Sequence, residues 1–442
     1  MSDDKFDVIV VGAGLAGCTA AYVLAREGLE VVVIERGNGA GSKNMTGGRL
    51  YAHTLERILP GFAEEAPIER RVTREKISFL SDRDAVTMDY QAGDYQAGDY
   101  QAGGQAAGRR PATAESYTVL RARFDPWLMG KAEEKGASLI DGIRVSELLT
   151  RDGRVVGVKA GDDELEADCV ILADGVNSLL GESLGFVKKV TPHHCAVGAK
   201  ELIELTPQQM RDRFGCEGRD GLAWLFAGMP SDGLMGGGFL YTNETSVSLG
   251  VVFGLHNIEA AGKSVPQMLE DFKAHPAVRP LIEGGQLIEY SAHVVPEGGL
   301  AMVPKIVGDG VLLTGDAAGF CLNVGYTVRG MDLAIASGEA AAKAVIAAKA
   351  RGDFSAAGLN QYQTLLNDSV VMKDLTLYRK LPGFLDNPRM FGAYPDMAAG
   401  VMADLFTVDG PSKPLLKKAG GHLRKVGLLN LVKDGLKGVT SL

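Results

Sequence analysis

The residues best suited to hold a chemical group are three glycines and one glutamate near the start of the chain. Gly12, Gly14 and Gly17 form a G-x-G-x-x-G turn that also contains Ala13, Leu15 and Ala16. The first glycine permits a tight turn, the second lets the backbone approach a pyrophosphate, and the third lets a helix pack on a strand. Glu35 follows about twenty residues later, where a carboxylate can accept hydrogen bonds from ribose hydroxyls. The pattern predicts a dinucleotide site, for FAD or NAD rather than NADP.

A strand, a helix and a second strand must position these residues. Asp7–Val11 is a β-branched run that predicts a buried parallel strand. Cys18–Glu27 predicts a small-residue helix, whose free N–H groups would face the phosphates. Glu30–Ile34 predicts the second strand, which delivers Glu35.

A second group of candidate ligand-binding residues lies near position 320. Val311–Asp316 predicts a buried strand ending in Gly315-Asp316, and Gly330-Met331-Asp332 opens an alanine-rich helix to about Ala350. Asp316 could bind a ribityl or ribose hydroxyl, and the N–H groups of residues 330–332 could face a polarised carbonyl. A structural N-cap would explain Asp332 alone, but not the crowding of glycines at 315, 319, 325 and 330.

Two glycine-rich stretches have simpler interpretations. Arg36–Gly48 holds five glycines in thirteen residues, so it is either a surface loop or a loop whose backbone lies against a flat ligand. Asp89–Gly103 is a DYQAG tandem without large aliphatic residues. It cannot offset its ordering entropy by burial, and we interpret it as an expanded loop without chemistry, with variable length over residues 89–109.

Composition excludes several protein classes. The 442 residues carry a net charge of −9, which argues against nucleic-acid binding. No apolar run reaches the roughly eighteen residues that span a bilayer, and no signal peptide is visible. The five cysteines form no C-x-x-C pair, so we expect neither a zinc site nor an iron–sulfur cluster, and scattered thiols suit the cytosol.

Four blocks together resemble the FAD-dependent oxidoreductases of the aromatic-hydroxylase and geranylgeranyl-reductase type. They are Gly12–Gly17 with Glu35, the R-x-x-F-D of Arg121–Asp125, Ala173–Ser178 and Gly315–Asp316. Three longer blocks resemble the FixC proteins, relatives of electron-transfer flavoprotein–quinone oxidoreductase: Gly41–His53, Tyr117–Leu128 and Thr314–Gly338. The resemblance covers nearly the whole chain, and the DYQAG tandem is its clear departure.

The resemblance implies FAD as the cofactor. Adenosine would lie on Glu35, the diphosphate near Arg121, and the adenine against the backbone of Arg144 and Val145. The isoalloxazine would lie near residues 46–48 and 330–332. The implied cofactor-binding residues are Gly12, Ala13, Gly14, Leu15, Ala16, Gly17, Glu35, Arg36, Met45, Thr46, Gly47, Gly48, Arg121, Arg144, Val145, Ala173, Asp174, Gly175, Gly315, Asp316, Gly325, Gly330, Met331 and Asp332.

The expected fold is α/β. A Rossmann-like FAD-binding domain of the glutathione reductase or aromatic hydroxylase type would occupy residues 1–190 and 301–350. Short strands dominate residues 191–300, which predicts an inserted, mainly antiparallel substrate domain. Residues 351–442 would form a helical C-terminal region.

The resemblance implies an enzyme that accepts electrons from an electron-transfer flavoprotein and passes them to membrane quinone, as the FixC-type subunit of an electron-bifurcating complex. Larger relatives hold a [4Fe–4S] cluster on C-terminal cysteines. This chain has no cysteine after Cys321, so a small ferredoxin-like subunit would carry any cluster.

Catalysis would be flavin chemistry, without a conspicuous acid–base pair. Trp224, Phe239 and Tyr241 lie in apolar stretches beside Gly236–Gly238, and could wall a quinone pocket or form an ordinary sheet core. His193, His194 and His293 are candidate proton donors, although isolated histidines are more often structural.

The basic segment near the C-terminus, residues 413–437, predicts a membrane contact. Residues 413–437 carry seven basic side chains against Asp434, with leucines at roughly helical spacing. We expect a peripheral protein on the inner face of the cell membrane, unless this helix docks on the protein itself or on a partner subunit.

Two other functions stay open at this stage. One is a flavin-dependent reductase of isoprenoid double bonds, such as a geranylgeranyl group. The other is a scaffold that keeps FAD only for structure. Loss of a geranylgeranyl substrate would reveal the first, and a bound flavin that no donor reduces would favour the second.

Overall fold

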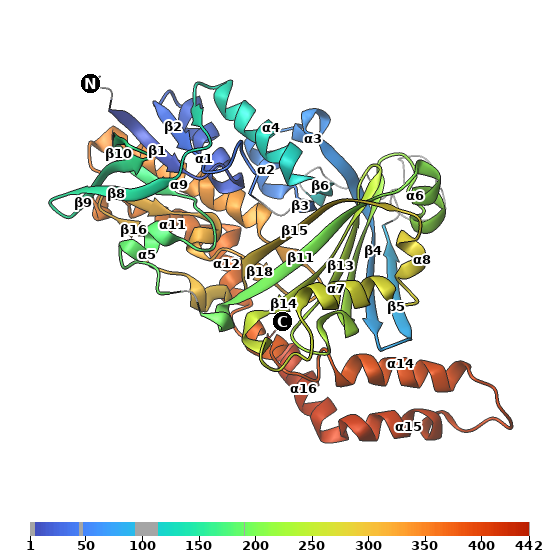
Figure 1. The fold of residues 1–442 in the computed structure, drawn as a ribbon. Helices are drawn as coiled ribbons and strands as arrows, with labels where there is room; N and C mark the ends of the chain where they lie inside the picture. Colours follow the sequence, from blue (N-terminus) through green and yellow to red (C-terminus); the bar gives the residue numbers. More distant parts are fainter. Residues whose placement is uncertain (1–4, 44–46, 93–113, 190, 442) are drawn as a thin grey trace, which may run out of the picture.

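Two large β-sheets, a small two-stranded sheet and a helical C-terminal region make up the described part of the computed structural model (Figure 1). The structure describes residues 5–43, 47–92, 114–189 and 191–441. Met45 and Thr46, two of the expected flavin contacts, lie outside the described residues, as does residue 93 onward of the DYQAG tandem. The tandem's first residues are a strand rather than a loop, because β5 (Ala85–Gln91) continues through Asp89.

The first sheet carries the glycine turn. Its strands run in the order β16-β17-β10-β1-β2-β7, and the four neighbouring pairs from β17 to β7 are parallel. The expected strand–helix–strand unit is present as β1 (Phe6–Val11), α1 (Leu15–Arg26) and β2 (Val31–Ile34). The other strands are β7 (Ser138–Ile140), β8 (Val145–Arg151), β9 (Arg154–Ala160), β10 (Asp163–Leu172), β16 (Val307–Gly308) and β17 (Val311–Leu313).

Three helices surround the glycine turn. Helix α1 packs against α9 (Met331–Arg351) and α4 (Arg121–Glu133). Gly338 lets α9 approach α1 closely, because a Cβ there would lie 2.3 Å from the Ala16 carbonyl oxygen. This packing brings the starts of α1 and α9 to the same end of the sheet, which is where parallel α/β sheets bind ligands.

Helix α4 begins earlier than its sequence predicts. Asp125 followed by Pro126 is typical of a helix start, but the helix already begins at Arg121. The Asp125 carboxylate is a bidentate acceptor for Arg121, with both N–O distances 2.6 Å. This i,i+4 ion pair stabilises the first turn. Pro126 lies inside the helix at its sixth residue, where it removes one intrahelical hydrogen-bond donor.

The second sheet draws on two parts of the chain. Its order is β15-β11-β14-β13-β12-β4-β6-β3, with β5 on β4. The expected strands of residues 191–300 are β11 (Cys195–Glu204), β12 (Asp220–Gly228), β13 (Gly236–Thr242), β14 (Ser246–Gly254) and β15 (Gln286–Pro296). The sheet also includes β3 (Gly48–Tyr51), β4 (Ile68–Leu80) and β6 (Ser116–Val119). The substrate sheet is therefore not confined to the predicted insertion.

One face of the second sheet has its own hydrophobic core. Helices α6 (Pro207–Phe214), α7 (Val265–Ala274) and α8 (Arg279–Ile282) carry side chains into this core with those of β12 and β14. Phe272 of α7 lies edge-on to Phe226, with ring centroids 4.9 Å apart. Because side chains alternate along a strand, the opposite face is left for residues such as Leu225.

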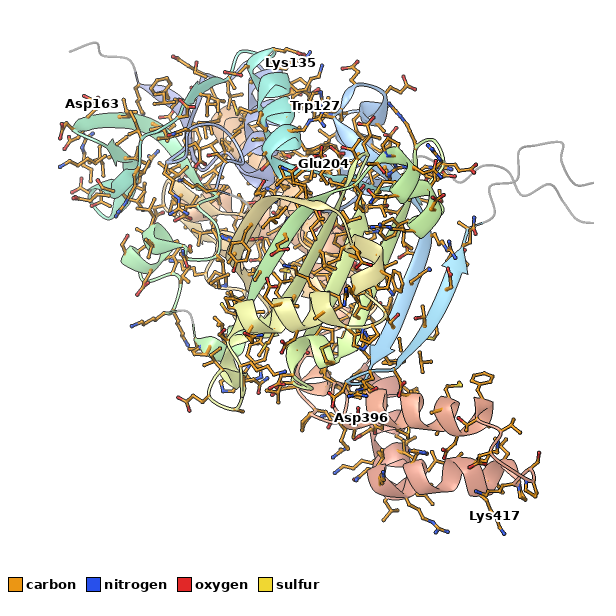
Figure 2. All side chains as sticks on the ribbon, turned by 45° about the vertical axis from the view of Figure 1, so that its right-hand side comes forward. Trp127, Lys135, Asp163, Glu204, Asp396 and Lys417 are labelled. Carbon is orange, nitrogen blue, oxygen red and sulfur yellow. The ribbon has the colours of Figure 1, made fainter. Side chains whose placement is uncertain are left out.

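The C-terminal region is helical, as expected. Short helices α10 (Ala356–Leu359), α11 (Gln361–Asp368), α12 (Val370–Leu377) and α13 (Leu381–Leu385) follow α9. Helices α14 (Ala393–Phe406) and α15 (Leu415–Val426) then form an antiparallel pair that projects from the body, with Lys417 near its tip (Figures 1 and 2). The chain returns through α16 (Leu428–Ser441), where buried Asp434 accepts hydrogen bonds from Arg389 and Tyr394.

Candidate functional site

The glycine turn is built for close backbone approach. Gly12 has φ of +103°, and a Cβ there would lie 2.4 Å from the Ala173 carbonyl oxygen. A Cβ on Gly17 would lie 2.0 Å from the Gly12 carbonyl oxygen, so α1 can start this close to β1 only without a side chain. Gly14 is the N-cap of α1, and no side chain caps the helix there. The first N–H groups of α1 are thus available to an anion.

Glu35 lies beside this turn. One carboxylate oxygen accepts a hydrogen bond from the Ala13 N–H at 2.9 Å, and the other accepts one from the Gly37 N–H at 2.7 Å. The Glu35 carbonyl accepts a hydrogen bond from the Ile143 N–H at 3.1 Å. Arg144 and Val145 follow Ile143 directly in the chain, so their backbone lies close to Glu35. The residues expected around an adenosine therefore lie together, with the Arg36 side chain exposed beside them.

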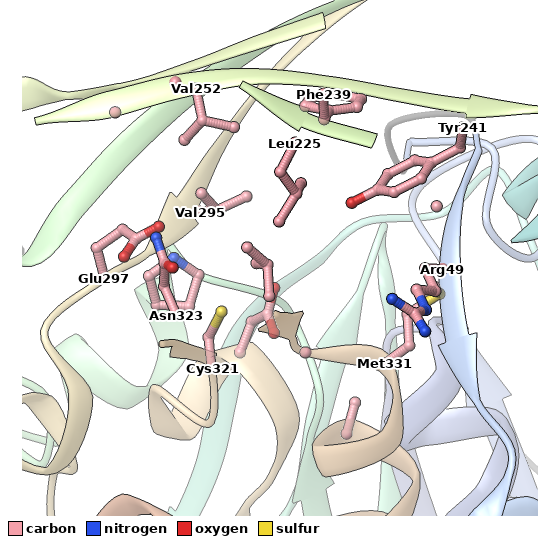
Figure 3. A pocket seen from close by; sticks show the side chains of 18 of the residues that line it. Arg49, Leu225, Phe239, Tyr241, Val252, Val295, Glu297, Cys321, Asn323 and Met331 are labelled. Carbon is pink, nitrogen blue, oxygen red and sulfur yellow. The ribbon is translucent and has the colours of Figure 1, made fainter. Parts of the chain in front are cut away.

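A cavity of about 330 Å³ runs from the glycine turn to the second sheet (Figure 3). Half of the expected flavin residues line it: Gly14, Leu15, Ala16, Gly47, Gly48, Arg121, Ala173, Gly175, Asp316, Gly325, Gly330 and Met331. Gly12, Ala13, Gly17, Glu35, Arg36, Arg144, Val145, Asp174, Gly315 and Asp332 do not line it.

Two helix N-termini meet at this cavity. The N-caps of α1 and α9, Gly14 and Gly330, both line it, and neither helix has a capping side chain. Each N-terminus presents partial positive charge and free N–H groups. A ligand with a pyrophosphate at one place and a polarised carbonyl at another fits both ends, and FAD is such a ligand. The donor set of this cavity therefore fits the expected cofactor.

Acidic groups near the cavity carry raised pKa values. Burial raises the pKa of Asp316, against the opposing effect of the Arg121 guanidinium. Burial also raises the pKa of Asp174 to about 6. The Oδ1 atom of Asp174 is buried and has no hydrogen-bond partner among the described residues.

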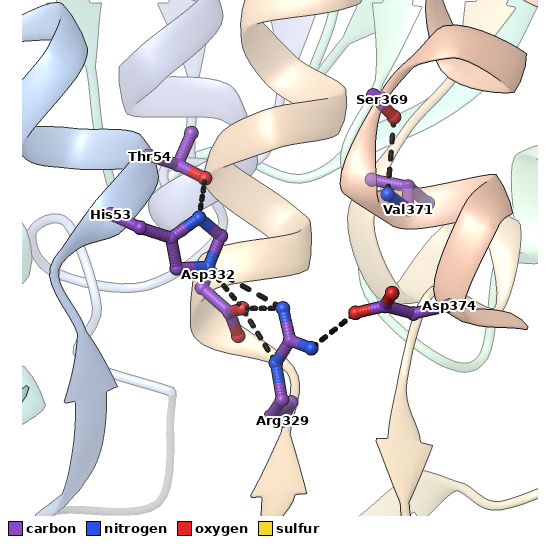
Figure 4. Close-up of polar contacts among 7 residues, drawn as sticks. All are labelled: His53, Thr54, Arg329, Asp332, Ser369, Val371 and Asp374. Carbon is purple, nitrogen blue, oxygen red and sulfur yellow. Dashed lines mark hydrogen bonds and ion pairs between the residues drawn. The ribbon is translucent and has the colours of Figure 1, made fainter. Parts of the chain in front are cut away.

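Asp332 anchors the start of α9 rather than lining the cavity (Figure 4). Its Oδ2 atom contacts His53 Nε2 at 2.9 Å and accepts from Arg329 Nε at 2.8 Å, and Arg329 also binds Asp374. Burial alone would raise the pKa of Asp332, but the hydrogen bonds from His53 and Arg329 outweigh it and lower that pKa. The cluster holds the helix end that faces the cavity.

The apolar end of the cavity is walled by the second sheet. Leu225, Phe239, Tyr241, Val252 and Val295 line it, as Figure 3 shows. Phe239 and Tyr241 were expected here, with their rings stacked at a centroid distance of 5.3 Å.

Trp224 was also expected in this wall, and the structure corrects that expectation. Its indole N–H donates to Ser78 Oγ at 2.8 Å, and its ring stacks on Phe226 in the core of the other face. The alternation of side chains along β12 separates Trp224 from Leu225, so the two neighbours face opposite sides. The expectation treated the apolar stretch around Trp224 as one block and did not take this alternation into account.

None of the three candidate histidines lines the cavity. His193 stacks on His256 with ring centroids 4.8 Å apart, at the end of the sheet. Burial lowers the pKa of His293 on β15. The histidines thus offer no proton-donating group at the cavity wall.

Two titratable residues at the site were missed from the sequence. Lys200 on β11 is buried, and its amine donates to the Gly47 carbonyl at 2.9 Å. Burial lowers its pKa to about 7. Glu297 lines the cavity just after β15, and burial raises its pKa to about 7. The sequence offered one signal for Lys200, which is its place inside the apolar run of β11. Glu297 lies in an ordinary P-E-G-G turn, which gave no signal.

Comparisons with known families agree with this arrangement. Residues 5–206 match the FAD binding domain family, and residues 112–344 match the FAD dependent oxidoreductase family. Residues 381–442 match the ETF-QO/FixC family C-terminal domain. FAD is therefore the cofactor, and the fold is that of FAD-dependent oxidoreductases.

Similar proteins cover the whole chain. The chain is 62% identical over 445 residues to the probable electron transfer flavoprotein-quinone oxidoreductase YdiS of Escherichia coli (strain K12), covering all of both chains. It is 61% identical over 443 residues to the protein FixC of Salmonella typhi, again over the full length of both.

Two solved structures share the fold. A geranylgeranyl bacteriochlorophyll reductase-like protein from Thermoplasma acidophilum matches with a TM-score of 0.68 at 21% identity, over 96% of this chain and 99% of that one. The myxobacterial halogenase CndH matches with a TM-score of 0.61 at 18% identity, over 97% of this chain and 90% of that one. At these identities the likeness concerns the fold alone.

Proposed function

Because the chain belongs to the family of FixC proteins and electron-transfer flavoprotein–quinone oxidoreductases, and is an FAD-dependent oxidoreductase of electron transfer, we propose that it reduces membrane quinone with electrons from an electron-transfer flavoprotein. The observation that carries the proposal is the continuity of one cavity. The same cavity is lined by the start of α9 at Gly330 and by the apolar wall of Leu225 and Phe239. A flavin bound at the start of α9 would therefore share one cavity with a ligand bound against this apolar wall.

The bound FAD supplies the two-electron redox chemistry. The chain's own residues hold and shield it. The N–H groups at the start of α1 would bind the pyrophosphate, and Glu35 would turn from the Ala13 N–H to the ribose hydroxyls. Arg121 stays fixed by Asp125 while presenting its charge to the cavity.

The walls of the cavity suit a lipid-tailed aromatic ligand. Phe239 and Tyr241 offer stacked rings, and Val252 and Val295 offer aliphatic surface. Apolar burial stabilises such a ligand by about 25 cal/mol for each Å² removed from water. Gly236 and Gly237 lie in the same wall, both with positive φ, where side chains would be strained. These glycines leave room that a quinone ring requires.

We further propose that the protein is the quinone-reducing subunit of an electron-bifurcating complex with a small ferredoxin-like iron–sulfur subunit. All five cysteines of the chain are buried and unpaired. They are Cys18, Cys169, Cys195, Cys216 and Cys321, and none lies in the C-terminal region. Any iron–sulfur cluster on the electron path would therefore be carried by another subunit.

The C-terminal helices support a peripheral membrane contact on the inner face of the cell membrane. Among the described helices, none is long and apolar enough to pass through a bilayer. Helices α15 and α16 instead expose large apolar side chains next to basic ones; Leu416 is 82% exposed and Leu429 is 87% exposed. Amphipathic helices of this composition bind anionic lipid surfaces.

The test is quinol formation by the FAD-loaded protein under anaerobic conditions. Reduced electron-transfer flavoprotein and a short-tailed quinone should yield quinol in proportion to the protein added. The Phe239→Ala variant should raise the KM for quinone, whereas Trp224→Phe, on the opposite face, should leave it unchanged. No quinol formation by a protein whose flavin is reduced would reject the proposal.

A second candidate is reduction of an isoprenoid double bond. The apolar cavity, which also suits a polyprenyl chain, is the observation that favours it. Incubation of the reduced protein with a geranylgeranyl substrate separates the two functions, since loss of a double bond would be detected by mass.

A further inference from the structure

One carboxyl group stands out at the apolar end of the cavity. Glu297 follows β15 by one residue and lies on the same face as Val295, with Asn323 beside it (Figure 3). Its backbone N–H donates to the His194 carbonyl at 2.8 Å, which fixes the turn. Arg121 and Asp316 line the cavity on the side of the glycine turn, so Glu297 is the carboxyl that reaches the sheet side.

The surroundings of Glu297 favour its protonated form. Among the described residues no ion pair is recorded for its carboxylate. The titratable groups facing it are the Cys195 thiol from β11 and the Cys321 thiol before β18 (Leu322–Asn323), and both feel its charge. Burial of the carboxyl raises its pKa, and a hydrogen bond from Asn323 partly opposes that rise. With a pKa of about 7, this carboxyl is protonated in about half of the molecules at neutral pH and can exchange its proton there.

Asn323 is oriented to receive the resulting charge. Its Oδ1 accepts a hydrogen bond from the Gly325 N–H at 2.9 Å, which turns the amide NH₂ group away from that loop. This leaves the NH₂ group available to the neighbouring Glu297 carboxyl, and Asn323 lowers the pKa of Glu297 against the larger effect of burial. The Glu297 carboxyl is the acid of this pair. The interaction of the Asn323 amide with it becomes stronger when the carboxyl loses its proton.

We propose that Glu297 is the proton donor to the quinone bound in this cavity, with Asn323 as its positioning residue. Reduction of a quinone to a quinol consumes two electrons and two protons. Bound FAD in its anionic, singly protonated reduced form would supply both electrons and one proton, and Glu297 would donate the second proton to a quinone oxygen. The carboxylate that remains accepts the Asn323 N–H and regains a proton from solvent. This inference rests on the proposed quinone reduction.

The experiment compares Glu297→Gln, Glu297→Asp and Asn323→Asp in the FAD-loaded protein. Glu297→Gln keeps the shape and cannot donate, so quinol formation should fall about 10²-fold or more while reduction of the flavin by its donor is unchanged. Glu297→Asp should restore part of the rate. Glu283→Gln, at an exposed pair with Arg279, is the matched control and should behave as wild type.

The pH profile adds a readout that a structural role would not move. Wild-type quinol formation should decline as pH rises through about 7, because the donor loses its proton. Asn323→Asp keeps the acceptor for Gly325 but removes the donor to Glu297 and adds negative charge, so the decline should move to higher pH. Infrared difference spectra of the FAD-loaded protein without quinone should show a carboxyl band with the same midpoint, absent in Glu297→Gln.

The outcomes separate this inference from the proposed function. Wild-type quinol formation that Glu297→Gln leaves unchanged would overturn the inference alone, as would a carboxyl band that titrates near pH 4. No quinol formation by wild type, despite a reducible flavin, would reject the quinone proposal and the inference together.

Discussion

The buried amine of Lys200 donates a hydrogen bond to the backbone carbonyl of Gly47, 153 positions earlier in the chain, at 2.9 Å. This contact ties the second sheet to the loop expected under the flavin. Gly47 has φ of +73°, and a Cβ there would lie 2.3 Å from Ser248 Oγ, so this position favours glycine. The contact therefore joins β11 to the residue just before β3, two strands that lie far apart in the order of the second sheet.

Lys200→Met should weaken FAD binding and change the pH dependence of stability. Burial lowers the pKa of Lys200 to about 7, so the folded state binds fewer protons than the unfolded state between about pH 7 and about 10.5. Stability of the wild type should therefore rise with pH across that window, and this rise should be smaller in Lys200→Met. Urea unfolding at pH 7 and pH 9 measures the free energy of unfolding at each pH. An equal change between the two pH values in wild type and Lys200→Met would contradict the burial argument.

Gly14→Val should abolish retention of FAD, because side-chain atoms would occupy the space where the backbone meets the pyrophosphate. The flavin content of purified protein, read from its visible spectrum, checks the expectation. Gly130→Val is the matched control, since a Cβ at that helical position meets no atom within 4 Å. Full flavin occupancy in Gly14→Val would show that the turn is wrongly assigned.

Arg329→Met should destabilise the fold by about 3 kcal/mol, because it removes the guanidinium that forms an ion pair with the buried Asp332 carboxylate. Arg279→Met removes an exposed ion pair with Glu283, and should cost less than about 1 kcal/mol. Denaturant midpoints of the two variants test the contrast. Similar small losses in both would mean that Asp332 does not depend on Arg329.

Reversing the basic charges of α15 should reduce binding to anionic vesicles. Each basic residue near such a surface contributes about 1 kcal/mol. Lys417→Glu, Lys418→Glu and Lys425→Glu together should therefore lower the vesicle-bound fraction at least about tenfold, and salt should lower it in wild type. Lys135→Glu with Arg211→Glu, exposed positions elsewhere, is the control. Unchanged co-sedimentation of the α15 variant would point to docking on a partner subunit instead.

Much of the first sheet could be predicted from the chain itself. The G-x-G-x-x-G turn, the apolar runs of β1 and β2, and the acid at Glu35 are local patterns with strict spacing, and the structure has the strand–helix–strand unit that they predict. The α9 helix was equally visible, because its alanine-rich run begins after a glycine cluster.

The second sheet was less visible for a physical reason. Strand β4 reads IERRVTREKISFL, and its charged side chains hide the apolar alternation of a strand. Arg70 on this strand is buried because its guanidinium donates to backbone carbonyls of residues 218, 220, 243 and 244. Such pairings join segments about 150 residues apart and leave no local pattern. The same holds for Lys200 and Glu297, whose importance depends on what the fold places around them.

The most direct test of the central claim is a stopped-flow measurement of the FAD absorbance under anaerobic conditions. Mixing the protein with NADH alone should leave its flavin oxidised, because its single dinucleotide fingerprint is occupied by FAD. Addition of reduced electron-transfer flavoprotein should then bleach the flavin, and a short-tailed quinone should restore it. Rapid bleaching by NADH alone, or a reduced flavin that quinone does not reoxidise, would contradict the account.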